Sequence, residues 1–298
     1  MRVLIAGGAG FLGAALRRSL ELDGHEVGIL TRRVPRSPIE IQWDGHSQGP
    51  WADRVCEFDA IVNATGYGLE HWPWTPSHKR AFHDSRILPG RALILALERA
   101  QHRPRVFLQL SGINRYGLHG TDSADEHTPA ADDFLARLTV DWEAATQPVE
   151  GLGVRWIAAR NAVVLDSRAG LFPLMALPVR LFVGGPLADG RQAVPWIHLA
   201  DTVGAYRFLL ENEAASGPCN IIAPQPASNA DFLRAVAAAL RRPYWLRTPA
   251  FLLRLILGEM SCLVVDGRYA RPQRLLELGY AFRYPTLQEA LEQLLERS

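Results

Sequence analysis

A glycine-rich stretch near the N-terminus constrains the fold of this chain more than any other feature. Gly7–Gly13, with the sequence GGAGFLG, joins an apolar run, Arg2–Ala6, to an amphipathic segment, Phe11–Leu22. We expect a strand, a sharp turn and a helix, because glycines let the backbone turn tightly and bring helix and strand close together. The N–H groups of the first helical turn would then bind a phosphate group, and a tight turn without a ligand is the alternative. The residues expected to line this phosphate site are Gly7, Gly10, Phe11, Leu12 and Gly13.

The same alternation of apolar runs and amphipathic segments continues through roughly the first 220 residues. This pattern is typical of a parallel sheet that is covered by helices on both faces. The further strands are expected at Val27–Leu30, Ile39–Trp43, Ala60–Ala64, Val106–Ser111 and Arg155–Ala159, and the long helices at Ser77–Gln101 and Phe134–Thr146. The sequence therefore predicts an α/β fold with a doubly wound parallel sheet, the Rossmann fold.

The last third of the chain differs, because prolines interrupt it and its regular elements are expected to be short. Helices are predicted at Ala230–Arg241 and Gln288–Leu295. We expect a dinucleotide-binding domain over residues 1–240 and a small C-terminal module over 241–298 that packs on it as a substrate lobe.

Composition and charge restrict the class of partner. Hydrophobic residues make up 48% of the 298 residues, charged residues 21%, and the formal net charge is +1, which favours neither nucleic acid nor an anionic membrane. The three cysteines are scattered, and the nine histidines show no metal-ligand spacing with them. Met1 is followed at once by the apolar run of the first strand. We expect a cytoplasmic protein with a small-molecule substrate, without a metal, and with a homodimer left open.

The end of the second predicted strand indicates which dinucleotide is bound. Enzymes that use NAD place Asp or Glu there to bind the ribose hydroxyls. This chain has Thr31, Arg32 and Arg33 instead, with no acidic residue from Leu30 to Arg36. Guanidinium groups can bind a 2′-phosphate through two charge-assisted hydrogen bonds. NADP(H) is therefore the predicted cofactor, and a solvated basic loop is the alternative.

The fourth predicted strand ends in the small residues Ala64, Thr65 and Gly66. At the carboxyl edge of a parallel sheet, small side chains let the adenosine side of a dinucleotide lie against the backbone. We predict that these three residues line the cofactor site. A buried strand followed by a turn is the alternative interpretation.

With these pieces, the chain resembles the atypical short-chain dehydrogenase/reductases of the epimerase family, which are related to NAD-dependent epimerase/dehydratases and carry a small C-terminal domain of unknown function. The resemblance covers nearly the whole length. The matching segments include Gly7–Gly13, Thr31-Arg32, Val62-Asn63, Gly66, Trp142-Glu143, Arg160, Gly184-Gly185-Pro186, Trp196-Ile197-His198 with Asp201, and Gly258-Glu259-Met260-Ser261. By similarity, the NADP(H) site would be lined by Thr31, Arg32, Ala64, Thr65, Arg86 and Val164.

The proton relay that is usual in this superfamily is missing from the sequence. Ordinary members carry Tyr-x-x-x-Lys on one helix, where the lysine lowers the pKa of the tyrosine. The single lysine of this chain, Lys79, precedes the fifth predicted strand, and the helix at Phe134–Thr146 contains no tyrosine. Turnover therefore does not follow from cofactor binding alone.

Ser111 and Tyr116 are the remaining catalytic candidates. Ser111 ends the fifth predicted strand, at the place of the superfamily's substrate-binding Ser or Thr, and Tyr116 matches a family tyrosine just downstream. Ser111 would bind a substrate carbonyl and Tyr116 would supply or accept a proton. In the alternative interpretation, Tyr116 is a packed loop residue and Ser111 ends the strand. Asn114 and Arg115 between them depart from the family pattern.

Other polar residues are weaker candidates. Glu70 or His71 could replace a glutamate that family members carry after Gly66. His198 and Asp201 are expected to form a structural hydrogen-bonded pair. The guanidinium of Arg191 could contact an anionic group of the substrate or form a salt bridge at the rim.

Three functions are consistent with these residues. The first is an NADP(H)-dependent oxidoreductase that acts on a small, unidentified substrate, with hydride transfer depending on positioning. The second is a sensor or scaffold that binds NADP(H) and has lost turnover. The third and weakest is a nucleotide-sugar epimerase or dehydratase, because that chemistry normally needs the missing tyrosine.

Overall fold

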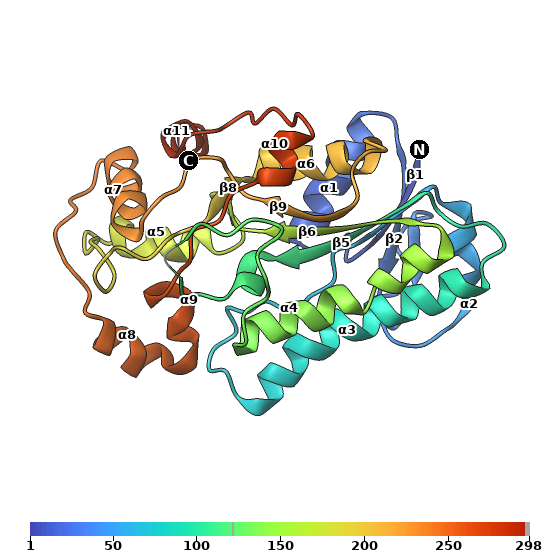
Figure 1. The fold of residues 1–298 in the computed structure, drawn as a ribbon, viewed down its shortest axis with the longest axis horizontal. Helices are drawn as coiled ribbons and strands as arrows, with labels where there is room; N and C mark the ends of the chain where they lie inside the picture. The colour runs from blue at the N-terminus through green and yellow to red at the C-terminus, as the bar shows by residue number, and fades with distance from the viewer. Residues whose placement is uncertain (121, 296–298) are drawn as a thin grey trace.

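A seven-stranded sheet forms the centre of the structure, a computed structural model that describes residues 1–120 and 122–295 (Figure 1). All neighbouring strands are parallel, in the order β3-β2-β1-β4-β5-β6-β9. The strands are β1 (Arg2–Ala6), β2 (Glu26–Thr31), β3 (Glu40–Gln42), β4 (Ala60–Asn63), β5 (Val106–Gly112), β6 (Arg155–Asn161) and β9 (Gly217–Ile221). The direction of winding reverses between β1 and β4, which is where doubly wound sheets bind ligands, beyond the carboxyl ends of the strands.

Helices cover both faces of this sheet (Figure 1). The larger ones are α1 (Phe11–Leu22) and α6 (Leu199–Glu211), which pack together on one face, and α3 (Pro76–Arg99) and α4 (Phe134–Ala144), which pack together on the other. In β1, Val3 and Ile5 belong to the core with α1 and α6, whereas Leu4 and Ala6 belong to the core with α3. All four side chains are fully buried, which explains a continuous apolar run in place of alternation. The predicted doubly wound α/β fold is confirmed.

A smaller group of elements lies beside the sheet and has its own core (Figure 1). Two short parallel strands, β7 (Val163–Leu165) and β8 (Trp196–His198), pair there. The helices that share this core are α5 (Phe172–Arg180), α7 (Asn229–Ala239) and α11 (Leu287–Leu295). The sequence did not predict β7 and β8, because strands of three residues are too short to show a clear period-2 pattern.

The C-terminal segment contacts both groups. Leu275 of α10 (Gln273–Glu277) is fully buried in the core on the α1 side of the sheet, and α11 packs against α7. Between α7 and α10 in the chain lie α8 (Ala250–Leu257), η4 (Gly258–Ser261) and α9 (Cys262–Val265). No residue of α8 is buried, although its sequence is AFLLRLIL. The division of the chain at residue 240 stays a prediction, and the last three residues of the predicted module, 296–298, lie outside the described part.

Two further observations concern the predicted elements. The third strand is shorter than predicted, at three residues, and the sixth extends to Asn161. Among the described helices, none has the length and apolar character needed to cross a membrane.

Candidate functional site

The glycine turn between β1 and α1 brings three backbone segments together. Gly7 has a φ of 82°, and a Cβ on it would lie 2.6 Å from the carbonyl oxygen of Ala64 after β4. A Cβ on Gly13 would lie 2.3 Å from the carbonyl oxygen of Gly7. Gly10 is the N-cap residue of α1, and no side chain among the described residues caps this N-terminus. The free N–H groups and the positive end of the helix dipole therefore suit a pyrophosphate.

The end of β2 presents two cationic side chains. The backbone N–H of Arg33 donates to Thr31 Oγ1 at 3.2 Å, which fixes the start of the turn. Arg32 and Arg33 are exposed, and their guanidinium groups have no hydrogen bond or ion pair with any residue of 1–120 or 122–295. The nearby strand β3 is followed by Asp44, whose carboxylate accepts from Ser47 and from the backbone of His46. These hydrogen bonds hold the pKa of Asp44 well below its usual range, so it is a charged acceptor for its own loop.

The loop after β4 is held by buried amide groups. Asn63 and Gln109 are fully buried, and Asn63 Nδ2 donates to Gln109 Oε1 at 2.9 Å. Asn63 Oδ1 accepts from the hydroxyl of Thr65 at 2.7 Å. Ala64 is joined to β1 through its N–H, which donates to the carbonyl of Ala6 at 2.8 Å. The predicted cofactor residues Ala64 and Thr65 thus lie directly beside the glycine turn.

Arg86 on α3 binds the loop after β4 through hydrogen bonds. Its Nη1 donates to the carbonyls of Tyr67 at 2.9 Å and Phe82 at 3.0 Å, and its guanidinium lies 4.8 Å from the ring centroid of Trp142. Burial lowers the pKa of Arg86 to about 10, which leaves it charged near neutral pH. A Cβ on Gly66 would lie 3.5 Å from the guanidinium carbon. Arg86 therefore positions the loop that the cofactor would contact.

The other side of the glycine turn meets the segment after β7. A Cβ on Gly170 would lie 2.9 Å from the ring of Phe11. Val164 in β7 is nearly buried and belongs to the same hydrophobic core as β1 and α1, against which Phe11 and Leu12 pack. The predicted cofactor residues of β1–α1, β2, β4, α3 and β7 are thus gathered around the carboxyl edge of the sheet, and their contact with a cofactor stays a prediction.

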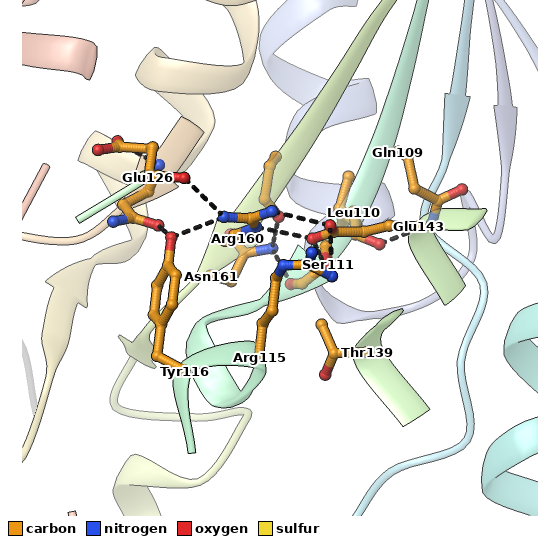
Figure 2. Close-up of polar contacts among 12 residues, drawn as sticks. Gln109, Leu110, Ser111, Arg115, Tyr116, Glu126, Thr139, Glu143, Arg160 and Asn161 are labelled. Carbon is orange, nitrogen blue, oxygen red and sulfur yellow. Dashed lines mark hydrogen bonds and ion pairs between the residues drawn. The ribbon is translucent and has the colours of Figure 1, made fainter. Parts of the chain in front are cut away.

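A buried hydrogen-bonded chain links the two predicted catalytic residues (Figure 2). Ser111 Oγ donates to Glu143 Oε1 at 2.7 Å, and Arg160 donates to both carboxylate oxygens of Glu143, at 2.8 Å from Nε and 2.9 Å from Nη2. Arg160 Nη1 donates to the hydroxyl of Tyr116 at 2.8 Å, and this hydroxyl donates to Asn220 Oδ1 at 2.7 Å. All five side chains are buried. We call these residues, Ser111, Glu143, Arg160, Tyr116 and Asn220, the buried polar network.

The electrostatics of this network favour a neutral Tyr116. Burial raises the pKa of Tyr116 to about 12, although the charge and hydrogen bond of Arg160 act in the opposite direction. Burial lowers the pKa of Arg160, but the hydrogen bonds and charge of Glu143 outweigh it, so the pKa of Arg160 is raised. Ser111 and Tyr116 do not face each other across an open site, because Glu143 and Arg160 separate them. Their catalytic roles stay a prediction, and in this arrangement both hydroxyls are already paired.

A cavity of about 520 Å³ opens next to this network. Its inner end is formed by Ile113 and Asn114 after β5 and by Asn161 and Ala162 at the end of β6. Its outer walls come from α5 and from the C-terminal module, and most of its surface is apolar. Because it begins at the carboxyl ends of β5 and β6, it can place a substrate beside a dinucleotide that is bound at the glycine turn.

The structure also places the weaker candidates relative to the cavity. Arg191 is exposed and does not line the described part of the cavity wall, whereas its neighbour Gln192 does. Glu70 lines the cavity, and His71 stacks on Tyr67 with ring centroids 4.0 Å apart. Lys79 forms an ion pair with Glu259 of η4 and is not on α4.

The predicted hydrogen-bonded pair of His198 and Asp201 is wrong in detail. His198 Nδ1 accepts from the backbone of Ala200 at 3.0 Å, which leaves Nε2 as the donor to Gln293 Oε1 at 2.8 Å. Asp201 accepts from the backbone N–H groups of Arg283 at 2.6 Å and Tyr284 at 2.9 Å. Both residues are structural, as expected, but each binds the C-terminal segment instead of the other. Sequence spacing could not reveal partners about 80 to 95 positions away.

The role of Glu143 and Arg160 was not predicted, although both were recognised as family matches. One feature of the sequence could have predicted this ion pair. Arg160 follows Ala158 and Ala159 at the end of an apolar strand, and a charge in such a buried position needs a buried partner. Asn114 was noted only as a departure from the family pattern. Its side chain lines the cavity without a hydrogen bond to any described residue.

Comparisons with known proteins agree with this geometry. Residues 3–222 match the family model described as the NAD dependent epimerase/dehydratase family, and residues 248–294 match a domain of unknown function, DUF1731. An epimerase family protein of Mycobacterium leprae is 36% identical, over 97% of this chain and 94% of its own. The crystal structure of the human epimerase family protein SDR39U1 with NADPH is 32% identical and has a TM-score of 0.92, covering 100% of both chains. A nucleoside-diphosphate sugar epimerase from Corynebacterium glutamicum is 29% identical, with a TM-score of 0.82, over 99% of this chain and 58% of its own.

Proposed function

The chain belongs to the NAD dependent epimerase/dehydratase family, as its motifs predicted, and within it we propose that this protein is an NADP(H)-dependent oxidoreductase acting on a small molecule in the cavity beside β5 and β6. The observation that carries the proposal is the position of that cavity. Its inner end lies at the carboxyl edge of the same sheet whose glycine turn, between β1 and α1, suits a pyrophosphate. Coenzyme and substrate would therefore meet over the ends of β4 to β6.

The residues present fit NADP(H). The glycine turn excludes side chains where the pyrophosphate would lie. The exposed guanidinium groups of Arg32 and Arg33, which have no partner among the described residues, suit a 2′-phosphate. The human relative crystallised with NADPH supports the same choice. Thr31, Ala64, Thr65, Gly66, Arg86 and Val164 complete the proposed site.

The chemistry of this site depends on positioning. Reduction of a carbonyl would move a hydride from the bound NADPH to the carbonyl carbon and a proton from water to the oxygen, giving an alcohol, NADP+ and hydroxide, which the buffer neutralises. The side-chain amide of Asn114 is available to donate a hydrogen bond to the carbonyl oxygen. The buried polar network fixes the ends of β5 and β6 behind it. We propose this orienting role for Ser111 and Tyr116 in place of direct proton transfer.

A direct assay tests the proposal. The protein is mixed with NADPH and a panel of aldehydes and ketones, and loss of the reduced nicotinamide is followed by absorbance together with the alcohol formed. We expect substrate-dependent oxidation with one alcohol formed per NADPH, and a lower kcat for Asn114→Ala. Tight NADPH binding without turnover of any member of the panel would contradict the proposal.

That contradicting result would favour the second candidate, a sensor or scaffold that binds NADP(H) without turnover. The observation in its favour is that both candidate catalytic hydroxyls, of Ser111 and Tyr116, are occupied within the buried polar network. The third candidate, a nucleotide-sugar epimerase or dehydratase, is weaker for two reasons. α4 carries no tyrosine for the usual proton transfer, and few charged residues line the described cavity to bind a nucleotide sugar.

The setting of the protein follows from the same proposal. We propose a cytoplasmic protein, because its three scattered cysteines suit a reducing compartment. We propose a small-molecule partner, because a net charge of +1 gives no field that would attract nucleic acid. A homodimer is kept as an expectation, which light scattering of the purified protein would check.

A further inference from the structure

The side chains that line the cavity indicate which class of substrate it can bind. On one side lies α5, with Leu174, Met175 and Pro178, and on the other lies the C-terminal module, with Leu253, Leu257 and Met260. These side chains offer no hydrogen-bond donor and only the weak thioether acceptor of methionine. A molecule that fills this space exchanges water for apolar contacts, so an apolar body would be favoured.

Charged side chains are scarce around the cavity. Arg268 is the one arginine or lysine among its described lining residues, and two of its nitrogens already donate to backbone carbonyls, Nη1 to Tyr116 at 2.9 Å and Nε to Asp122 at 3.4 Å. The acidic lining residues, Glu70 and Asp266, would repel an anion. A diphosphate buried here would lack the cations that its charges need. The cavity therefore disfavours a nucleoside-diphosphate sugar.

A few polar groups are left for a ligand. Gln192 Nε2 donates to the carbonyls of Leu187 at 3.1 Å and Val264 at 2.8 Å, which fixes the orientation of the amide. Its Oε1 is buried and has no hydrogen-bond partner in the part of the chain that the structure describes. Asn114 lines the inner end, and its side-chain amide has no hydrogen bond with a residue that the structure describes. An apolar pocket with so few polar groups fixes orientation while its walls select for shape and hydrophobicity.

We propose that the substrate is an uncharged, lipid-like carbonyl compound, whose apolar body lies between α5 and α8 and whose carbonyl lies at Asn114. Gln192 Oε1 accepts a hydrogen bond from a hydroxyl or N–H group where the compound carries one. This assignment rests on the proposed function for the presence of the cofactor, but the apolar character of the ligand follows from the cavity alone.

Ligand binding can be measured without any turnover. The uncharged fluorescent probe N-phenyl-1-naphthylamine is titrated into the full-length protein and then displaced with 2-tridecanone, or with UDP-glucose as the charged competitor. NADPH binding is measured in parallel by its own fluorescence. We expect the ketone to displace the probe and UDP-glucose to have no effect.

Two matched pairs of variants locate the binding site. Leu257→Gln alters the cavity wall, whereas Leu255→Gln alters a residue of the same helix that is 78% exposed and does not line the described cavity. Leu174→Gln on α5, a half-exposed residue in the opposite wall, and Leu177→Gln on the same helix form the second pair. We expect about tenfold weaker binding of the ketone in each wall variant and unchanged binding in each control.

The outcomes separate the two proposals. If the ketone binds as wild type to both wall variants, or if UDP-glucose displaces the probe, the assignment of an apolar substrate is wrong even where NADPH binds. If the ketone binds in the predicted way but NADPH does not bind, the apolar site stands and the proposed function fails.

Discussion

Two parts of this molecule are built in different ways. The sheet half comprises the seven-stranded sheet with α1, α3, α4 and α6, and the cavity half comprises α5, α8, η4 and α9 around the cavity. In the sheet half, backbone atoms approach so closely that Gly7 and Gly13 have no room for a Cβ, and the polar groups at the end of β5 are paired and buried. In the cavity half, α8 has no buried residue, and apolar side chains surround open space. The difference suits a fixed cofactor at the sheet and, under the proposed function, a substrate in the cavity, where we expect substitutions to cost little stability.

The largest expected effect tests the tightest part of the sheet half. Glu143→Gln leaves the buried guanidinium of Arg160 without its counter-charge, and we expect the free energy of unfolding to fall by about 3–5 kcal/mol. Urea denaturation measures it. The control is Asp132→Asn, because the pair of Asp132 with Arg137 is exposed and should matter little. Equal effects of the two variants would show that the network does not stabilise the sheet.

Gly13→Ala tests the close approach of the glycine turn. The new Cβ would meet the carbonyl oxygen of Gly7 at 2.3 Å, so the backbone must shift. We expect a loss of about 1–3 kcal/mol in unfolding free energy, together with a loss of NADPH binding. In contrast, Gly151→Ala has nothing within 4 Å of its new Cβ. Unchanged NADPH binding by Gly13→Ala would remove the glycine turn from the cofactor site.

Tyr116→Phe tests a single member of the buried polar network. Loss of the hydroxyl leaves Asn220 Oδ1 without its donor, and we expect a loss of about 1–2 kcal/mol near neutral pH. Since the pKa of Tyr116 is raised by burial to about 12 in the folded protein, it favours folding below pH 10 and loses this contribution as the pH rises toward 12. The variant should therefore show a shallower loss of stability over that interval, by thermal melts at each pH.

The same variant separates an orienting role from proton transfer. If Tyr116 only orients the strand ends, Tyr116→Phe keeps turnover within about tenfold and the pH profile of kcat is unchanged in form. Complete loss of turnover in a folded Tyr116→Phe protein, with NADPH still bound, would restore the direct catalytic role predicted from the sequence.

The smallest effect on stability belongs to the cavity half. We expect Leu257→Gln to change the free energy of unfolding by about 0.5 kcal/mol or less, because α8 buries none of its residues. Leu275→Ala, in α10 on the α1 side of the sheet, should instead cost about 2–5 kcal/mol, since Leu275 is fully buried. If Leu257→Gln were as destabilising as Leu275→Ala, the contrast between the two halves would be lost.

The sequence predicted the sheet half well because its signals are local. The turn at Gly7–Gly13 is recognised from the glycines of seven consecutive residues. The continuous apolar run of β1 indicates that both faces of this strand are covered. The prediction of a 2′-phosphate site likewise depends only on the position of Arg32 and Arg33 directly after β2. The fold and the expected cofactor edge could therefore be read from short segments.

The cavity half could not be predicted in the same way. Asn114, Gln192 and Leu257 become neighbours of one cavity only through tertiary packing, and nothing in their local sequence connects them. The pairing of Glu143 with Arg160 likewise spans 17 positions and two elements, so each looked like an isolated family match. The helix AFLLRLIL is apolar except for Arg254, yet none of its residues is buried, and only Leu253 and Leu257 line the described cavity.

The most direct test of the account is the preference of the protein for NADPH over NADH, measured by fluorescence titration of the wild type and of Arg32→Ala/Arg33→Ala. The control is Arg18→Ala, an exposed arginine of α1 that makes no ion pair with a described residue. We predict that NADPH binds the wild type about 100-fold more tightly than NADH, that the double variant loses this preference, and that the control retains it. Equal affinity for the two coenzymes in the wild type, or an unchanged preference in the double variant, would contradict the claim that the end of β2 binds a 2′-phosphate.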